Sequence, residues 1–408
     1  MRPAVRPCPS KLAKVFALFA IVALLFSVLP VPAVQAAPDA PHATTTIAVL
    51  SDYGSGTALE QTVADMIASW NPVRIVTAGD NYHYQNCSSY ATCVGNYYGS
   101  YVTAQTFMPS LGNHDYDSTV GLTAYNSYFT WLPTNADAQR RRYDFVAGDV
   151  HFFMIDGNRD RYTQAEWDNQ TAWLQSTATA STSAWKIAVI HQAPYSTGYY
   201  GDIADSQLPY GQFDIDFVIA GHNHHFERLM KADGGKTVRY FIDGYGGTIL
   251  SGDYGHSYCS YSTSEATSEF CLADTPGAIK LTASDTSITF DYYDSTGVVR
   301  NTYTEVIGPE ITTSVSSLDS FSTTPGTPSA AQTYTVSGSL LSADISITAP
   351  AGFEIKTDAG TYGSTITLPQ TGGVVSPTTI SVRLTGAAEG NFAGNIAHTR
   401  SGAEQQDV

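Results

Sequence analysis

The chain has 408 residues, of which 43% are hydrophobic and 14% are charged. This is the composition of a globular protein rather than a disordered one, and the length is sufficient for two or three domains. Acidic residues (37) outnumber Lys and Arg (20), which gives a formal net charge of −17. A surface with this charge would repel duplex nucleic acid and anionic membranes, so neither is expected as a partner.

The first 36 residues have the pattern of a secretion signal. A basic start is followed by a largely apolar run, Val15–Leu29, and then by a small-residue cleavage site, Val34–Ala36. The run is shorter than the roughly 20 residues that a membrane span needs, which favours a removed signal over an anchor. No later segment is long and apolar enough to span a bilayer. We therefore predict a secreted or cell-surface protein, with a signal at 1–36 and a linker at 37–44.

The predicted signal contains Cys8, so four cysteines remain in the mature protein. Four cysteines allow three pairings. We favour Cys87 with Cys93 and Cys259 with Cys271, because each pair closes a short loop and an oxidising compartment permits both. A zinc site is the alternative, but the close Cys-x-x-Cys pairs typical of zinc sites are missing from the sequence.

From Thr45 to about Thr304, short β-branched runs alternate with helical patterns. Strands are predicted at Thr45–Leu50 and Val73–Ala78, and the apolar residues between Leu59 and Trp70 recur at helical spacing. Further predicted elements are strands at His151–Ile155, Lys186–Ile190 and Asp216–Ala220, a helix around Ala165–Gln175, and a strand-rich region after Ile279. This alternation predicts an α/β layered fold for residues 45–308.

The character of the sequence changes near Gly308. Residues 309–330 are rich in Ser, Thr and Pro, and they are predicted to form a linker or a first edge strand. From Tyr334 onward, apolar and polar residues alternate, and turn residues interrupt them at intervals of roughly ten residues. We therefore predict an all-β sandwich domain over 331–408.

The chemistry of this second domain is not visible in its sequence. It contains one histidine, His398, which is expected at the surface, and no cysteine. The domain is either a binding module for glycan or the cell surface, or a structural spacer. One more strand would be expected after Val408, which is consistent with a truncated sequence.

Carboxylate, amide and imidazole side chains gather in five short segments of the first domain. These segments are Asp52–Gly54 (DYG), Gly79–His83 (GDNYH), Gly112–Asp115 (GNHD), His191 and Gly221–His225 (GHNHH). Each follows a predicted strand or lies in a loop, and in open α/β sheets ligands bind beyond the carboxyl ends of the strands. Imidazole and carboxylate ligands without thiolate suit zinc, iron or manganese. One such motif would be weak evidence, but five in this order indicate a dinuclear metal site.

In this order, the five segments resemble the motifs of the calcineurin-like metallophosphoesterases, and the purple acid phosphatases are the most similar branch. The run His222–Arg228 (HNHHFER) and the glycines of Asp243–Gly247 look similar to the same branch. The resemblance covers roughly residues 45 to 308. It implies a four-layer α/β/β/α sandwich built from two mixed sheets.

The resemblance also implies a role for each motif residue. The implied metal ligands are Asp52 and His224 for the first ion, Asn113, His191 and His222 for the second, and Asp80 as a bridge between both. His114 would face the substrate. The two metal ions (iron, zinc or manganese) would acidify a bridging water, and the resulting hydroxide would attack phosphorus in line with the leaving group.

Two positions depart from the family pattern. Purple acid phosphatases have a metal-binding Tyr three residues after the bridging Asp, where this chain has His83. Either the imidazole of His83 takes that coordination position, or it lies behind the ligands and a water binds the metal. Tyr200 stands where some relatives have a His in the substrate loop, and it either contacts the substrate or packs against the wall. His225, beside His224, either reaches the substrate or is structural.

The sequence therefore predicts a secreted hydrolase of phosphoric esters, with small phosphomonoesters as the favoured substrates. Phosphodiesters or nucleotides are the alternative, because the same metal core serves both. A further alternative is an inactive, phosphatase-like binding protein at the cell surface. The nearly complete set of ligands argues against inactivity.

Overall fold

The computed structural model describes residues 44–83, 86–117, 120–134, 136–248, 258–400 and 406–408. The predicted signal at 1–36 and nearly all of the linker at 37–44 lie outside these residues. Within them, no helix combines the length and the apolar character that crossing a membrane would require.

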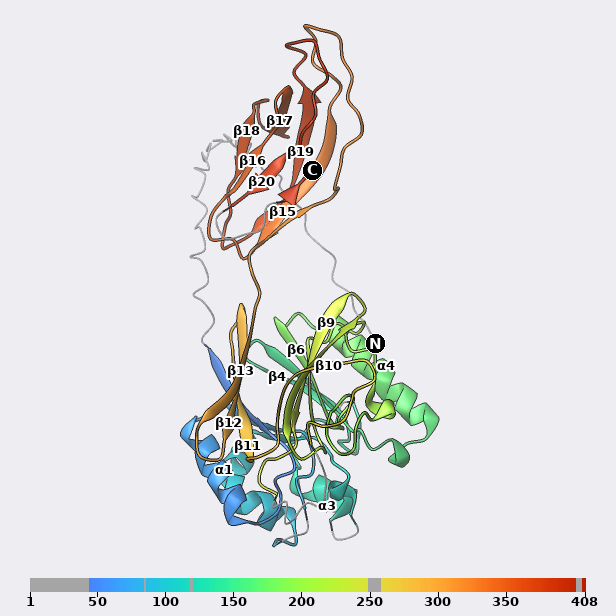
Figure 1. Cartoon of the computed structure of the whole chain (residues 1–408), viewed down its shortest axis with the longest axis vertical. Helices are drawn as coiled ribbons and strands as arrows, with labels where there is room; N and C mark the ends of the chain where they lie inside the picture. The colour runs from blue at the N-terminus through green and yellow to red at the C-terminus, as the bar shows by residue number, and fades with distance from the viewer. Residues whose placement is uncertain (1–43, 84–85, 118–119, 135, 249–257, 401–405) are drawn as a thin grey trace, which may run out of the picture. The chain divides into compact units, whose positions relative to one another are not determined.

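Two mixed β-sheets form the first part of the described chain (Figure 1). The first sheet has six strands in the order β13 (Val299–Val306), β12 (Ser287–Asp294), β11 (Gly277–Ala283), β1 (Thr45–Leu50), β2 (Arg74–Thr77) and β3 (Phe107–Pro109). The second has seven, in the order β10 (Thr267–Leu272), β8 (Phe226–Asp233), β9 (Lys236–Asp243), β7 (Phe217–Gly221), β6 (Trp185–Gln192), β5 (Val150–Ile155) and β4 (Tyr143–Ala147). Strands β1, β2 and β3 run parallel, as do β5, β6, β7 and β9, so the carboxyl ends within each set lie along one edge.

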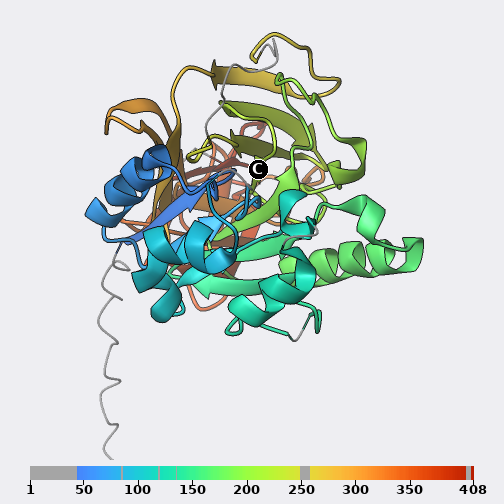
Figure 2. The same ribbon diagram turned by 90° about the horizontal axis from the view of Figure 1, so that it is seen from below.

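Helices cover the outer faces of these sheets. The helical elements are α1 (Ala58–Ser69), α2 (Asn96–Thr103), α3 (Gly121–Tyr128) and α4 (Gln164–Ala180), with single turns at Ala91–Gly95, His114–Tyr116, Arg159–Arg161 and Ala204–Ser206. Figures 1 and 2 show α1 (blue) beside the first sheet and α4 (green) beside the second. Helix α4 begins at a capping box, in which Thr163 and Glu166 exchange hydrogen bonds. Helix α1 was predicted from apolar spacing and α4 as a helix around Ala165–Gln175, and both are present.

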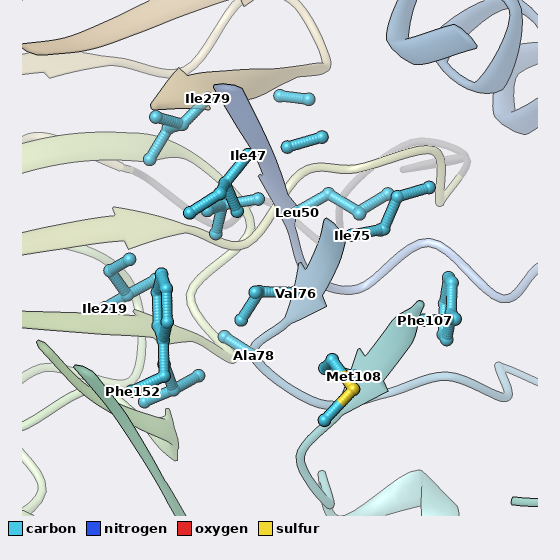
Figure 3. Packing of buried hydrophobic residues seen from close by; sticks show 14 of the residues in the cluster. Ile47, Leu50, Ile75, Val76, Ala78, Phe107, Met108, Phe152, Ile219 and Ile279 are labelled. Carbon is cyan, nitrogen blue, oxygen red and sulfur yellow. The ribbon is translucent and has the colours of Figure 1, made fainter. Parts of the chain in front are cut away.

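The main core lies between the two sheets. Because side chains alternate along a strand, Ile47 and Val76 of the first sheet face the second sheet, where Phe152 and Ile219 meet them (Figure 3). On the opposite face of the second sheet, a separate cluster of buried residues packs under Leu174 and other residues of α4. The arrangement is helix, sheet, sheet, helix, which confirms the predicted four-layer fold.

The C-terminal region is all-β, as predicted. Its two four-stranded antiparallel sheets have the orders β14 (Glu310–Thr313), β15 (Gln332–Ser339), β19 (Val375–Leu384), β17 (Phe353–Thr357), and β18 (Thr365–Leu368), β16 (Ile345–Thr348), β20 (Ala397–Thr399), β21 (Gln406–Asp407). Residues of both sheets, such as Val336 and Ile347, share one buried cluster. Strand β14 is an edge strand within the segment 309–330.

The expectation that His398 lies at the surface is wrong. Its side chain is fully buried, and its Nε2 lies 2.7 Å from the hydroxyl oxygen of Tyr334. Tyr334 is on β15 and His398 is on β20, so this hydrogen bond links the two sheets. A polar side chain at an inward position of an alternating strand is satisfied here by a partner from a distant part of the sequence.

Both disulfides expected from local pairing are present. Cys87 bonds to Cys93, and Cys259 bonds to Cys271 of β10. The second disulfide has a role in loop packing, because the backbone N–H groups of Ser260 and Tyr261 both donate to the carbonyl oxygen of Thr197 at 3.2 Å. It therefore ties β10 to a segment that leaves β6.

Replacing Ile219 by Ala is expected to lower the free energy of unfolding by about 2–5 kcal/mol, because it opens a cavity between the sheets. The matched control is Val146→Ala on β4, where the side chain is 54% exposed and the loss should stay below about 0.5 kcal/mol. Tryptophan fluorescence during urea unfolding is a suitable measurement, because all five tryptophans lie before residue 186 and report on this part of the chain. Equal losses in the two variants would contradict the assignment of the core.

Candidate metal centre

The sequence-predicted site residues come together where strands of both sheets end. Asp52 follows β1, Asp80 follows β2, and Asn113 lies in the loop after β3. His191 is near the end of β6, and His222 directly follows β7. Residues that are far apart in sequence thus meet at the carboxyl ends of parallel strands, where ligand sites form in α/β sheets.

Three of these residues leave their strands in a left-handed backbone conformation. The φ angles are 52° at Asp52, 50° at Asp80 and 67° at His222. This conformation is uncommon outside glycine, and it costs of order 1–3 kcal/mol per residue unless the surroundings compensate. Its occurrence at three neighbouring strand ends indicates that the fold holds these side chains in place against their local preference.

The side chains form groups that could each hold a metal ion. In each group, one ligand atom per residue lies within 4.8 Å of the others; the groups around the two carboxylates are Asp52/His83/His224, Asp80/His83/His114 and Asp52/Asp80/His191. His191 Nε2 lies 3.4 Å from Asp80 Oδ2, and His224 Nε2 lies 3.4 Å from Asp52 Oδ1. Two buried carboxylates are therefore surrounded by imidazoles, which is a donor set that fits zinc, iron or manganese.

Asn113 and His222 complete this constellation at its margin. The side-chain oxygen of Asn113 lies 3.1 Å from His191 Nε2. His222 is a described residue, but it belongs to none of the three groups. Its ring centroid lies 5.1 Å from that of His191. Its backbone N–H instead donates to Asp52 Oδ2 at 3.0 Å, so the residue after β7 is fastened to the residue after β1.

The buried carboxylate of Asp80 and the imidazole of His191 stabilise each other's charged forms. Burial raises the pKa of the Asp80 carboxyl, but His191 and the neighbouring imidazoles outweigh burial and hold that pKa well below its usual range. Burial likewise lowers the pKa of His191, but Asp80 and Asp52 outweigh it and raise that pKa to about 10. His191 Nδ1 faces the carbonyl oxygen of Ala78 at 2.7 Å, which turns Nε2 toward the carboxylates.

The side chain of His83 lies close to the two carboxylates of the site. Its side chain is buried, and its ring centroid lies 4.3 Å from that of His114 and 5.7 Å from that of His224. Its Nε2 lies 3.8 Å from Asp80 Oδ2. His83 belongs both to the group of Asp52 and His224 and to the group of Asp80 and His114.

No role was predicted for Asp115, the last residue of the GNHD motif. Its buried carboxylate accepts hydrogen bonds from the backbone of Gly112 at 2.8 Å and from the side-chain amide of Asn81 at 2.9 Å. Burial raises the pKa of this carboxyl to about 7. Asp115 therefore ties the loop after β3, which carries Asn113, to the loop after β2, which carries Asp80.

His225 is fully buried, which corrects the suggestion that it reaches the substrate. Its Nε2 lies 3.0 Å from Glu227 Oε2. Glu227, also fully buried, accepts hydrogen bonds from the backbone N–H of Thr197 at 2.8 Å and from the hydroxyl of Ser268 at 2.7 Å. The pair thus links the loop that carries His222 and His224 to Thr197 and to β10. In the sequence, the only signal for this role is the position of Glu227 within HNHHFER.

Tyr200 lies at the rim of the site. Its ring stacks on that of His222, with centroids 4.2 Å apart, and 43% of the residue is exposed. The residue therefore packs partly against His222 and is partly exposed, so substrate contact and wall packing both remain as predictions.

Residues 45–226 match the family model of the calcineurin-like phosphoesterases. This part of the chain belongs to that family. The predicted family is thereby confirmed, and the predicted enzyme class, hydrolases of phosphoric esters, is the class that the family name describes.

Among curated proteins, this chain is 30% identical over 145 residues to an uncharacterized protein of Mycobacterium tuberculosis strain H37Rv, and equally to that of strain CDC 1551 / Oshkosh. Each alignment covers 30% of this chain and 27% of the relative. The chain thus matches little more than a quarter of the length of these relatives.

Two solved structures are similar to part of this chain. GAP50, the anchor in the inner membrane complex of Plasmodium, is 19% identical with a TM-score of 0.49, over 65% of this chain and 89% of that one. Purple acid phosphatase PPD1 from yellow lupin (Lupinus luteus) seeds is 16% identical with a TM-score of 0.49, over 64% and 54%. At these identities, neither structure carries its activity over to this chain.

Glu60 of α1 holds the loop that follows Asp52. Its buried Oε2 accepts hydrogen bonds from the backbone N–H groups of Ser55 at 3.1 Å and Gly56 at 2.7 Å. Burial raises the pKa of this carboxyl from 4.5 to about 9. The folded protein therefore keeps a proton that the unfolded chain releases, and stability should fall as the pH rises from about 4.5 to 9.

Glu60→Gln is expected to weaken this pH dependence, because Gln keeps an oxygen acceptor and has no proton to lose. Between pH 5 and pH 8, the wild type should lose stability relative to the variant, by at most about 1.4 kcal/mol per pH unit. Urea unfolding of both proteins at the two pH values measures the difference. Parallel losses would show that Glu60 releases its proton at an ordinary pKa in the folded state.

Proposed function

We propose that this protein is an exported, metal-dependent phosphoesterase of the purple acid phosphatase-like branch, and that it hydrolyses phosphomonoesters. The observation that carries the proposal is the pair of buried carboxylates, Asp52 and Asp80, that share His191 within one ligand group. Buried carboxylates are stable only when cations or hydrogen-bond donors compensate them, and the surrounding imidazoles are also suitable metal ligands.

The proposed ligands are Asp52 and His224 for one ion, Asn113, His191 and His222 for the other, and Asp80 for both. When bound, the two ions, which we propose to be iron, zinc or manganese, would polarise the phosphate oxygens and acidify the attacking water. Asn113 would fill its position as a neutral amide, without adding negative charge that repels phosphate.

His114 is proposed to contact the substrate. Its backbone N–H donates to Asp80 Oδ1 at 2.9 Å, and its Nδ1 lies 3.0 Å from Asp117 Oδ2. Asp117 lies at Nδ1, and we propose that the other ring nitrogen, Nε2, meets a phosphate or leaving-group oxygen of the substrate. Nε2 lies 3.9 Å from Asp80 Oδ2, and the side chain is 22% exposed, so a substrate at the carboxylates could reach it.

Export of the protein is proposed from the signal pattern at 1–36 and from the two disulfides, which are typical of oxidising compartments. Nothing in the described C-terminal residues favours glycan or cell-surface binding over a structural spacer. The proposal of activity is therefore confined to residues 45–308.

Asp80→Ala is expected to reduce metal-dependent hydrolysis of an aryl phosphate by about a thousandfold or more, because it removes the carboxylate that both ions would share. Asp65→Ala, at an exposed position of α1, is the matched control and should retain wild-type kcat/KM. Steady-state rates after loading with Fe, Zn or Mn in turn supply the comparison. Full activity in Asp80→Ala would contradict the proposed metal site.

If folded wild-type protein hydrolyses no monoester with any of these metals, phosphodiesters and nucleotides become the first alternatives. An inactive binding protein at the cell surface is then the next alternative. Tryptophan fluorescence confirms that each preparation is folded.

We further propose that the imidazole of His83 takes the coordination position that a Tyr holds in purple acid phosphatases. The iron-loaded wild type should then lack the intense visible band of an iron–tyrosinate bond, whereas His83→Tyr should gain one. His83→Ala should weaken metal binding by about 10- to 100-fold. Visible spectra and metal titrations test this directly, and an intense band in the wild type would implicate Tyr82 or Tyr84 instead.

A further inference from the structure

A single turn, His114–Tyr116, carries the histidine that is proposed to contact the substrate. The turn is a 3₁₀ helix of three residues, and the side chain of Asn113 at its start makes no capping hydrogen bond. So short a helix makes few hydrogen bonds of its own. Its orientation therefore depends on its contacts with other parts of the fold.

Each residue of this turn is attached to a different partner. The backbone N–H of His114 donates to Asp80 Oδ1 at 2.9 Å. The buried carboxylate of Asp115 accepts hydrogen bonds from the loops after β2 and β3. The hydroxyl of Tyr116 donates to Oδ2 of Asp156, the residue directly after β5. The first two attachments thus belong to the first sheet, and the third belongs to the second sheet.

Asp156 is fully buried, and hydrogen bonds fix both its side chain and its backbone. Its Oδ1 accepts hydrogen bonds from the backbone N–H of Asn158 at 3.0 Å and from the side-chain amide of Asn158 at 2.7 Å. Its backbone exchanges hydrogen bonds of 3.3 and 3.0 Å with the side-chain amide of Gln170 on α4. Moving Asp156 would leave these buried polar groups without partners, which is costly, so it offers Tyr116 a fixed acceptor.

The same hydrogen-bond network reaches the strand that carries His191. The side-chain oxygen of Asn158 accepts a hydrogen bond from Nε2 of Gln192 at 2.8 Å. Gln192 directly follows His191 on β6. The bond between Tyr116 and Asp156 therefore connects the turn of His114 to the end of β5 and, through Asn158, to the end of β6.

We propose that Tyr116 and Asp156 are positioning residues for His114, and that their hydrogen bond holds the turn in the orientation in which the imidazole meets the substrate. This inference rests on the proposed phosphoesterase function and on the proposed role of His114. A group that is displaced by about 1 Å from its substrate can lose about a hundredfold in rate, so a bond two residues away from His114 is sufficient to matter.

The test is a double-mutant cycle on the metal-loaded protein, with p-nitrophenyl phosphate as substrate. Tyr116→Phe removes the hydroxyl and keeps the ring, and kcat/KM should fall by about 5- to 100-fold. In a His114→Ala background, the same substitution should change kcat/KM by less than about twofold, because the group that it positions is gone. Asp156→Asn should also lower kcat/KM, because an amide nitrogen replaces one of the two oxygens that accept hydrogen bonds.

The matched control is Tyr303→Phe on β13, where the tyrosine hydroxyl also donates to a carboxylate, that of Glu305. This variant should keep the kcat/KM of the wild type. Equal losses from Tyr116→Phe in the wild-type and His114→Ala backgrounds would overturn the positioning role, because Tyr116 would then act on something other than His114. Weaker metal binding in Tyr116→Phe, measured by titration, would also overturn it, because the whole centre would then be disturbed.

Failure of the proposed function is distinguishable from failure of the positioning role. If the wild type hydrolyses no phosphate ester, the nuclear magnetic resonance signal of the His114 imidazole, assigned with His114→Ala, still reports on the turn. Tyr116→Phe should shift or broaden this signal, whereas Tyr303→Phe should not, and the signal of His398 in the C-terminal region serves as the internal reference. An unchanged His114 signal in Tyr116→Phe would overturn the positioning role.

Discussion

The carboxylates of Asp52 and Asp80 are buried side by side, and this proximity is the constraint on which the rest of the site depends. Two like charges in a buried position repel each other and lose their hydration. The imidazole of His191 lies within ligand distance of both and compensates part of this repulsion. A pair of metal ions would compensate it more fully, which is why the geometry is better explained as a metal centre than as an internal ion pair.

The fold supplies the positions that this arrangement needs. Parallel strands of two sheets end at one edge, and the core between the sheets holds those ends at a constant separation. Polar groups then fasten each loop to its neighbour. Ser51 donates its hydroxyl to Asp52, Asp115 joins the loops after β2 and β3, and the backbone of His222 donates to Asp52. The strained backbone at the strand ends persists because these contacts surround it on all sides.

Around this centre, a second set of contacts shapes the rim. Glu227 receives hydrogen bonds from the loop after β6 and from β10, and it pairs with His225 of the metal-site loop. One buried carboxylate thereby joins three segments that are distant in sequence. Beside these segments, the ring of Tyr200 stacks on that of His222.

The local pattern of the sequence was sufficient to predict five strands and two helices of the first domain, because side-chain periodicity reflects burial along a single element. It did not predict α2, α3 or strands such as β8 and β9. It also indicated Asp52, Asp80, His191 and His224 as neighbours, because each follows a strand or lies in a motif of characteristic spacing. The burial of His225 and His398 could not be read in the same way. Whether an imidazole meets solvent, a carboxylate or a phenol depends on partners such as Glu227 and Tyr334, which distant segments bring into contact. The stacking of Tyr200 on His222 was likewise decided by tertiary structure alone, since it requires two loops from neighbouring strands to meet, and no local pattern encodes that contact.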